Sequence, residues 1–208
     1  MKKAIIFDMD GTLWDSAEEV TKSWNIVFKK HNLKEITNED MQNCMGLIMD
    51  DIFIKLLPDL DPTTRKQIQD ECEEYENIYL STHCGKLYEG LEESLKQLKE
   101  MGYHNLIVTN AQDGYVQAFL KASNLDYLFT DYEMYGRTLL SKCDNIKLII
   151  QRNNVDKAVY VGDTVWDYKS ATNAGVDFIH AAYGFQQFEC EHKIQKLNDL
   201  IDLVPNIL

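Results

Sequence analysis

The chain has 208 residues, of which 45% are hydrophobic, so it can bury a substantial core as one large domain or as a core with a smaller appendage. Its 21 lysine and arginine residues against 34 aspartate and glutamate residues give a formal charge of −13. A protein of that sign repels a phosphate backbone and an anionic bilayer, which argues against nucleic acid and membrane partners. The composition does not indicate an oligomeric state.

The five cysteines stand far apart and form no C-x-x-C pair, so neither a zinc knuckle nor a redox motif is indicated. Reduced thiols are the simplest interpretation. The apolar run near Met1 is too short for a signal peptide, and no apolar run reaches the length of a membrane span. We therefore expect a soluble, cytoplasmic protein.

The first predicted strand is the apolar run 4–7, which ends in Asp8 and Asp10, followed at once by Gly11 and Thr12. Residues i and i+2 of a strand point to the same side, so both carboxylates leave the sheet together at its carboxyl end. Open α/β sheets bind their ligands at that edge. Two crowded acids favour a cation, and one of them is free to attack an electrophile. For an isolated Asp-x-Asp, a solvated acidic turn is the simpler interpretation.

From residue 15 to residue 83 we find only helical periodicity, and we predict helices over residues 17–30, 38–56 and 63–80. Pro58 and Pro62 separate the last two, because proline disfavours helix in the residue before it. We expect residues 15–84 to form a small helical domain, inserted after the first strand and covering the carboxyl edge of the sheet. The third helix has an acidic face that we interpret as solvated, formed by Asp70, Glu71, Glu73, Glu74 and Glu76.

After this insertion, strand-like and helical segments alternate. We predict strands over residues 105–108, 158–161 and 176–180, and a weaker one over residues 127–130. We predict helices over residues 91–101, 115–122, 144–152 and 167–174. This alternation is typical of a parallel, doubly wound α/β sheet. The core would then consist of residues 1–14 and 85–208.

Polar side chains follow the other predicted strands. Thr109 and Asn110 end the second strand, Asp163 and Asp167 lie in the turn after residues 158–161, and Lys142 begins the preceding helix. Capping of the following helix is the simpler interpretation for the two aspartates. Together with the first two acids, however, this set meets the needs of phosphoryl transfer. Such a site requires a nucleophile, a proton donor, oxygen ligands for Mg²⁺ and groups that hold the phosphate oxygens.

In order and spacing, these motifs resemble the haloacid dehalogenase-like superfamily, in the branch whose helical cap is inserted after the first strand. The resemblance covers nearly the whole chain. Two positions depart from the family pattern: Glu89, before Gly90, stands where proline is usual, and Cys143 replaces the proline that usually follows the lysine. The matching segments are Asp8-Met9-Asp10-Gly11-Thr12-Leu13, Val108-Thr109-Asn110, Lys142 and Gly162-Asp163-Thr164-Val165-Trp166-Asp167.

The resemblance implies a role for each matching residue. Asp8 would be the nucleophile, forming an aspartyl-phosphate, and also a metal ligand. Asp10 would be the general acid and base, with its backbone carbonyl on the metal. Thr109 and the backbone near Asn110 would bind the transferring phosphoryl group, and Lys142 would neutralise the nucleophile and the phosphate.

The resemblance also implies a Mg²⁺ cofactor and a cap loop that contacts the substrate. Asp163 would bind Mg²⁺ directly, and Asp167 would bind it through water or orient its ligands. Gly46, in the segment 46–49, would belong to a loop of the cap that dips towards the phosphate site. Trp14, Trp24, Met45 and Met49 are candidates to line that region, although packing is the commoner role of such side chains.

Several functions share this set of core residues. Asp10 favours phosphoryl transfer over carbon–halogen hydrolysis, which needs neither the acid nor the metal. A sugar-phosphate mutase of the β-phosphoglucomutase type is an alternative, and Thr12 favours a hydrolase because we expect valine there in the mutases. A phosphonatase would need a cap lysine for a Schiff base, such as Lys22, Lys29 or Lys30. A catalytically silent phosphate-binding protein is the remaining alternative, which the retained core acids disfavour. We expect a phosphatase acting on a small phosphorylated metabolite such as phosphoglycolate or a sugar phosphate.

Overall fold

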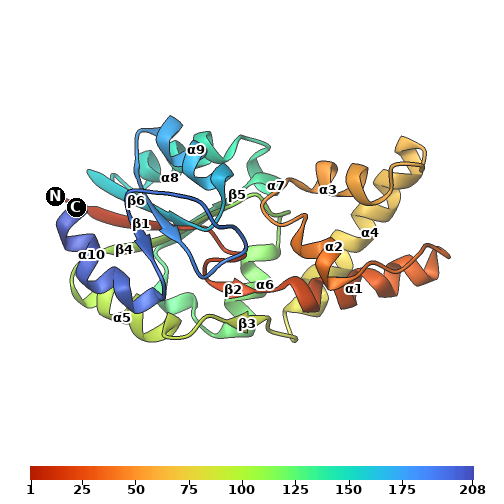
Figure 1. Cartoon of the computed structure of the whole chain (residues 1–208), viewed down its shortest axis with the longest axis horizontal. Coiled ribbons are helices and arrows are strands. Elements are labelled where there is room, and N and C mark those ends of the chain that lie inside the picture. The colour runs from red at the N-terminus through yellow and green to blue at the C-terminus, as the bar shows by residue number, and fades with distance from the viewer.

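The computed structural model describes all 208 residues and contains a central sheet of six parallel strands (Figure 1). β1 (Lys3–Phe7) lies between β4 (His104–Thr109) and β6 (Lys157–Gly162). The spatial order β5-β4-β1-β6-β7-β8 shows that the chain extends the sheet from β1 first in one direction and then in the other. The outer strands are β5 (Asp131–Met134), β7 (Asp177–Ala181) and β8 (Lys193–Ile194). The predicted parallel, doubly wound α/β sheet is therefore confirmed.

Helices cover both faces of the sheet (Figure 1). α8 (Lys142–Arg152) and α9 (Val165–Ala174) pack on one face. The opposite face is covered by α5 (Leu91–Glu100), α6 (Tyr115–Ser123) and α10 (Leu200–Ile207). Within β1, Ala4 and Ile6 pack towards α8 and α9, whereas Ile5 and Phe7 pack towards the other helices. Burial on both faces explains why this strand is apolar at every position from Ala4 to Phe7.

The segment after β1 forms a helical cap, which lies to the right of the sheet in Figure 1. α1 and α4 pack along each other, and aromatic side chains fill the space between them and α3. The rings of Trp24 and Phe53 are 4.7 Å apart, and those of Phe28 and Phe53 are 6.4 Å apart. The cap consists of α1 (Ala17–Lys30), α2 (Asn38–Gln42), α3 (Met49–Leu56) and α4 (Pro62–Leu80).

The chain passes between the sheet and the cap through a short antiparallel ribbon. It is formed by β2 (Trp14–Asp15) and β3 (Lys86–Leu87), in which Trp14 pairs with Leu87. Strands of two residues are too short to give a sequence pattern, and we did not predict them. The ribbon lies beside the expected boundaries at residues 14/15 and 84/85, and the division into core and cap remains a prediction.

Two predicted elements differ from the structure. The single helix expected over residues 38–56 is two helices, because the chain turns between them at Gly46, whose φ is +87°. The strand expected over residues 127–130 begins only at Asp131, after a 3₁₀ turn at Asp126–Leu128. Its charged residues pair with Arg152 of α8, so this edge strand has no apolar run by which to recognise it.

Several short elements had no counterpart in the sequence prediction. They are β8, α10, α7 (Tyr135–Thr138) and the 3₁₀ turn Leu197–Asp199.

All five cysteines are free. No helix combines the length and hydropathy that a membrane crossing requires.

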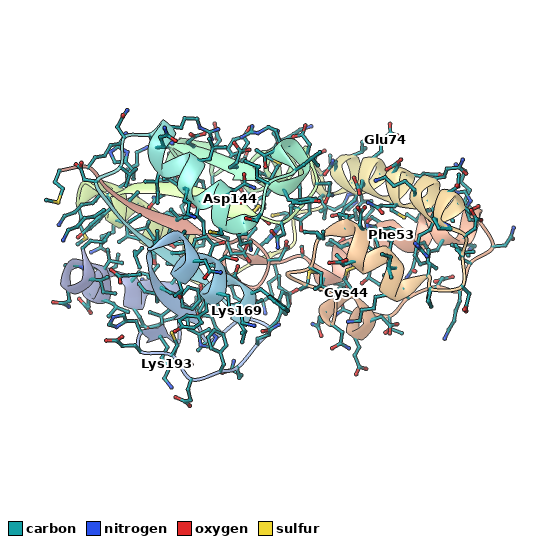
Figure 2. The ribbon with its side chains drawn as sticks, turned by 90° about the horizontal axis from the view of Figure 1, so that it is seen from above. Cys44, Phe53, Glu74, Asp144, Lys169 and Lys193 are labelled. Carbon is teal, nitrogen blue, oxygen red and sulfur yellow. The ribbon has the colours of Figure 1, made fainter.

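The packing of the cap predicts a large loss of stability when Phe53 is truncated. Phe53 is fully buried and contacts Trp24 and Phe28, so Phe53→Ala leaves a cavity and should lower the free energy of unfolding by about 3–5 kcal/mol. Figure 2 shows Phe53 within the cap. Ile54, on the same helix, is 51% exposed, and Ile54→Ala should change stability by about 0.5 kcal/mol or less. Urea unfolding of both variants tests this, and equal losses would contradict it.

Candidate active site

Asp8 lies at the carboxyl end of β1, on the side of the sheet that faces α8 and α9. It has the same parity as Ala4 and Ile6, which pack against those helices, so the alternation of the strand directs its carboxylate to that side. There Lys142, at the start of α8, donates hydrogen bonds to Asp8 Oδ1 at 2.8 Å and to Asp167 Oδ1 at 2.6 Å. All three side chains are buried. Residues far apart in the sequence thus meet as one charged group.

Helix starts hold two of these residues in place. Ser141 caps α8 by accepting a hydrogen bond from the backbone N–H of Asp144, which fixes Lys142 in the first turn. At the start of α9, Thr164 and Asp167 form a reciprocal capping box, in which Asp167 Oδ2 accepts from Thr164. One carboxylate oxygen of Asp167 therefore caps its helix, and the other accepts the hydrogen bond from Lys142.

Three carboxylates gather at this point. One oxygen each of Asp8, Asp163 and Asp167 lie within 4.8 Å of one another. Asp163 Oδ2 accepts a hydrogen bond of 2.7 Å from the backbone N–H of Phe185, but its Oδ1 is buried and has no partner. Burial of a carboxylate oxygen without a partner is costly, so a ligand at this position would stabilise it.

The charges of the cluster do not balance. Three carboxylates against the ammonium of Lys142 leave two negative charges uncompensated in a buried site. A divalent cation that prefers oxygen ligands, such as Mg²⁺, would supply the missing charge and the partner for Asp163. The residues present therefore fit the expected metal.

Burial of the cluster shifts its acid–base properties. Burial raises the pKa of Asp8 to about 7, and Asp167 adds to this while Lys142 opposes it. Burial and the carboxylates of Asp167 and Asp8 likewise raise the pKa of Asp163. For Lys142, burial lowers the pKa, but the two carboxylates outweigh it and hold the pKa above its ordinary value. The lysine thus stays charged, whereas the carboxylates need a cation to stay ionised together.

Two glycines let the backbone approach Asp163 closely. A Cβ on Gly11, whose φ is +81°, would lie 2.2 Å from Asp163 Oδ2. A Cβ on Gly184 would lie 2.4 Å from Asp163 Cβ. Any side chain at either position would displace the aspartate, so both glycines preserve the geometry of the cluster.

The side chain of Asp10 is held by hydrogen bonds from residues outside the acidic cluster. Its Oδ1 accepts hydrogen bonds from Ser16 Oγ and, at 2.7 Å, from Tyr115 Oη. Burial raises the pKa of Asp10 above its ordinary value, although the bonds from Ser16 and Tyr115 oppose the shift. A carboxyl group with a raised pKa is suited to donate a proton near neutral pH. The expected metal contact of Asp10 concerned its backbone carbonyl, and that contact remains a prediction.

Thr109 and Asn110, at the end of β4, face the cap loop. Asn110 Nδ2 donates a hydrogen bond of 3.0 Å to the carbonyl oxygen of Gly46. Thr109 is buried, and its hydroxyl accepts a bond from the backbone N–H of Ala111. Thr109, Asn110 and Gly46 line one cavity. Asp8, Asp10 and Lys142 line the same cavity. The structure thus brings the expected phosphate-binding groups and the expected cap residue together.

Three of the four cap candidates line this cavity, namely Trp24, Met45 and Met49. The fourth, Trp14, does not line it and packs instead between Tyr115 and Phe119, whose ring centroids lie 5.8 and 4.9 Å away. Its large apolar surface is used in the core, which was the simpler interpretation.

Four residues at the site were not predicted from the sequence: Ser16, Tyr115, Gln112 and Glu76. Glu76 was assigned to a solvated acidic face, and that assignment is wrong, since its side chain is buried and lines the cavity. The spacing contained the signal. Cys72, Glu76 and Leu80 recur every four residues and form the buried stripe of α4. Ser16 and Tyr115 gave no signal, because 99 residues separate them and only the fold brings them to Asp10.

Comparison with known proteins agrees with the geometry. The family model described as haloacid dehalogenase-like hydrolase matches residues 5–181. The chain is similar to a phosphoglycolate phosphatase of Mannheimia succiniciproducens, at 27% identity over 88% of this chain and 87% of that protein. It is also similar to the pyrophosphatase PpaX of Halalkalibacterium halodurans, at 26% identity over 96% of this chain and 95% of that protein.

Solved structures show the same fold. A predicted phosphoglycolate phosphatase from Haemophilus somnus superimposes with a TM-score of 0.86 at 23% identity, over 98% of each chain. A predicted phosphatase from Clostridium acetobutylicum superimposes with a TM-score of 0.83 at 22% identity, over 99% of each chain. The family model covers most of the sequence, and its match agrees with the motifs at the strand ends: the chain belongs to the haloacid dehalogenase-like hydrolases, as the resemblance predicted.

Proposed function

We propose that this enzyme is a Mg²⁺-dependent phosphatase that hydrolyses a small phosphomonoester through an aspartyl-phosphate on Asp8. The observation that carries the proposal is the buried cluster of Asp8, Asp163, Asp167 and Lys142, which adjoins a cavity shared with Asp10. The relatives support it, because those described above are named as phosphatases or a pyrophosphatase.

In the first step, a carboxylate oxygen of Asp8 attacks phosphorus, and the bond from phosphorus to the ester oxygen breaks. Lys142 holds Asp8 Oδ1, which leaves Oδ2 for the attack. The proton of Asp10 passes to the departing ester oxygen, so the leaving group departs as an alcohol. The hydroxyl of Thr109 and the ammonium of Lys142 would hold the non-bridging phosphate oxygens.

In the second step, water attacks the phosphorus of the aspartyl-phosphate. The carboxylate of Asp10 takes a proton from that water, the bond from phosphorus to the Asp8 oxygen breaks, and inorganic phosphate is released. Ser16 and Tyr115 orient Asp10 in both steps. Asp8, Asp163 and Asp167 would hold Mg²⁺, which when bound offsets the negative charge of the phosphoryl group.

Replacing the nucleophile should abolish turnover. Asp8→Asn removes the attacking oxygen but keeps the shape of the side chain, so release of p-nitrophenol from p-nitrophenyl phosphate should fall by about 10³-fold or more. The matched control is Asp177→Asn, an exposed position at the amino end of β7, which should retain the wild-type rate. Circular dichroism would show that both variants are folded. A wild-type rate in Asp8→Asn would exclude Asp8 as the nucleophile.

Replacing the general acid should separate the two steps. p-Nitrophenolate is a good leaving group and needs little protonation, so Asp10→Asn should still form the aspartyl-phosphate from p-nitrophenyl phosphate. Hydrolysis of this aspartyl-phosphate needs Asp10 as a base, so that step should slow by about 10²–10⁴-fold. Stopped-flow measurements should therefore show a burst of p-nitrophenol close to one equivalent per chain, followed by slow turnover. A uniform slowing without a burst would contradict the double role of Asp10.

Binding of Mg²⁺ should stabilise the fold, because it compensates the two excess negative charges of the cluster. Mg²⁺ at about 100 times its dissociation constant should add about 2.7 kcal/mol to the free energy of unfolding. Thermal melting with Mg²⁺, with EDTA, and with NaCl at equal ionic strength measures this effect independently of activity. In Asp163→Asn the Mg²⁺-specific gain should largely disappear. If the variant gained as much as the wild type, Asp163 would not be a ligand.

A further inference from the structure

A buried glutamate of the cap lies in the cavity where the leaving group of the substrate would sit. Glu76, on α4, is 2% exposed and lines the same cavity as Asp8 and Asp10. Its carboxyl group accepts a hydrogen bond from the indole N–H of Trp24 and interacts with the side chain of Gln112. Neither partner carries a positive charge. Glu76 thus differs from Asp8 and Asp167, which are buried beside Lys142.

No other residue that lines the cavity provides an unpaired positive charge near Glu76. Its cap wall is apolar, and Lys142 is the only basic residue among those that line it. Lys142 is already paired with Asp8 and Asp167. A carboxylate on the leaving group would therefore meet the carboxyl groups of Glu76 and Asp10 with no cation to balance it. The apolar wall is formed by Val20, Trp24, Met41, Met45, Leu47, Met49 and Ile52.

On the basis of the proposed phosphatase function, we propose that Glu76 determines the substrate class. The enzyme would take a small phosphomonoester whose leaving group has a short apolar body and a cationic end, such as an ammonium group. The ammonium would pair with the Glu76 carboxylate, and the apolar body would pack on the methionines and Trp24. The cavity, of about 50 Å³, favours a compact leaving group over a long one.

The electrostatic environment of Glu76 supports a cation at this position. Burial raises the pKa of Glu76 to about 8, with Asp10 and Glu73 adding to the shift, and an adjacent cation would restore the ionised carboxylate. A leaving group with a carboxylate has no such effect on Glu76. On this inference the substrate differs in charge from phosphoglycolate, for which similar proteins are named.

Three esters of similar size, which differ in the charge at the far end, test the proposal. 2-Aminoethyl phosphate carries an ammonium, n-propyl phosphate a methyl group and phosphoglycolate a carboxylate. We expect kcat/KM to be highest for 2-aminoethyl phosphate, by at least about tenfold over n-propyl phosphate, and lowest for phosphoglycolate. A preference for phosphoglycolate, or equal values for all three, would overturn the proposal.

A matched pair of variants assigns the preference to Glu76. Glu76→Gln keeps the shape and hydrogen bonding of the side chain but removes its charge, so the advantage of 2-aminoethyl over n-propyl phosphate should disappear. Glu74 lies on the exposed side of the same helix, as Figure 2 shows, and Glu74→Gln should retain that advantage. A role of Glu76 in packing alone would lower the melting temperature of Glu76→Gln without changing the ratio, and that result would refute the assignment.

The two proposals can fail separately. Mg²⁺-dependent hydrolysis of p-nitrophenyl phosphate tests the phosphatase function without the charged end group. If that ester is hydrolysed but phosphoglycolate is preferred, the phosphatase stands and the inference about Glu76 is wrong. If no ester is hydrolysed, the proposed function fails. Calorimetric binding of the three esters to Asp8→Asn protein with Mg²⁺ then still decides the inference, which requires the tightest binding for 2-aminoethyl phosphate.

Discussion

The burial of three carboxylates around one ammonium at the carboxyl edge of the sheet is the constraint on which the site depends. The parity of β1 directs Asp8 towards α8 and α9, and the starts of those helices supply Lys142 and Asp167. Two negative charges remain, and one oxygen of Asp163 has no partner. Without a cation this arrangement is costly, because buried carboxylates resist ionisation. With a divalent cation it becomes a place where an acidic protein, of formal charge −13, can receive a phosphate ester.

The position of Asp10, the proposed proton donor, depends on both parts of the molecule. Asp10 is held by Tyr115 from the core and by Ser16, which immediately precedes the first cap helix. A second bond, from Asn110 to Gly46, joins the end of β4 to the cap loop. The contacts around the acidic cluster therefore join the sheet to the cap at Asp10 and at Asn110.

The sequence was informative where function depends on local order along the chain. Two of the three acids of the cluster, Asp8 and Asp163, follow a strand directly, so they could be recognised after an apolar run without tertiary structure. The predicted position of β5 is wrong because the charged residues Asp131 and Glu133 interrupt any apolar pattern in this strand. Both carboxylates pair with Arg152, which stabilises them in an edge strand. Ser16 and Tyr115 were missed because their role arises from contacts across the fold. Glu76 was misread because its acidic neighbours outweighed the four-residue spacing that places it on the buried stripe.

Core and cap therefore carry different kinds of information about the reaction. In the proposed mechanism the motif residues act at phosphorus, and these are the residues that support membership of the family. The leaving group would meet the side chains of α1, α3 and α4 that line the cavity, so its identity does not follow from that membership. Phosphorus would bind between Lys142 and the cation of the acidic cluster, where the field is positive. The cap side of the cavity holds Glu76 and no basic residue. With the proposed cation bound, a cavity of opposite polarity on its two sides would be complementary to a substrate that carries a phosphate at one end and a positive charge at the other.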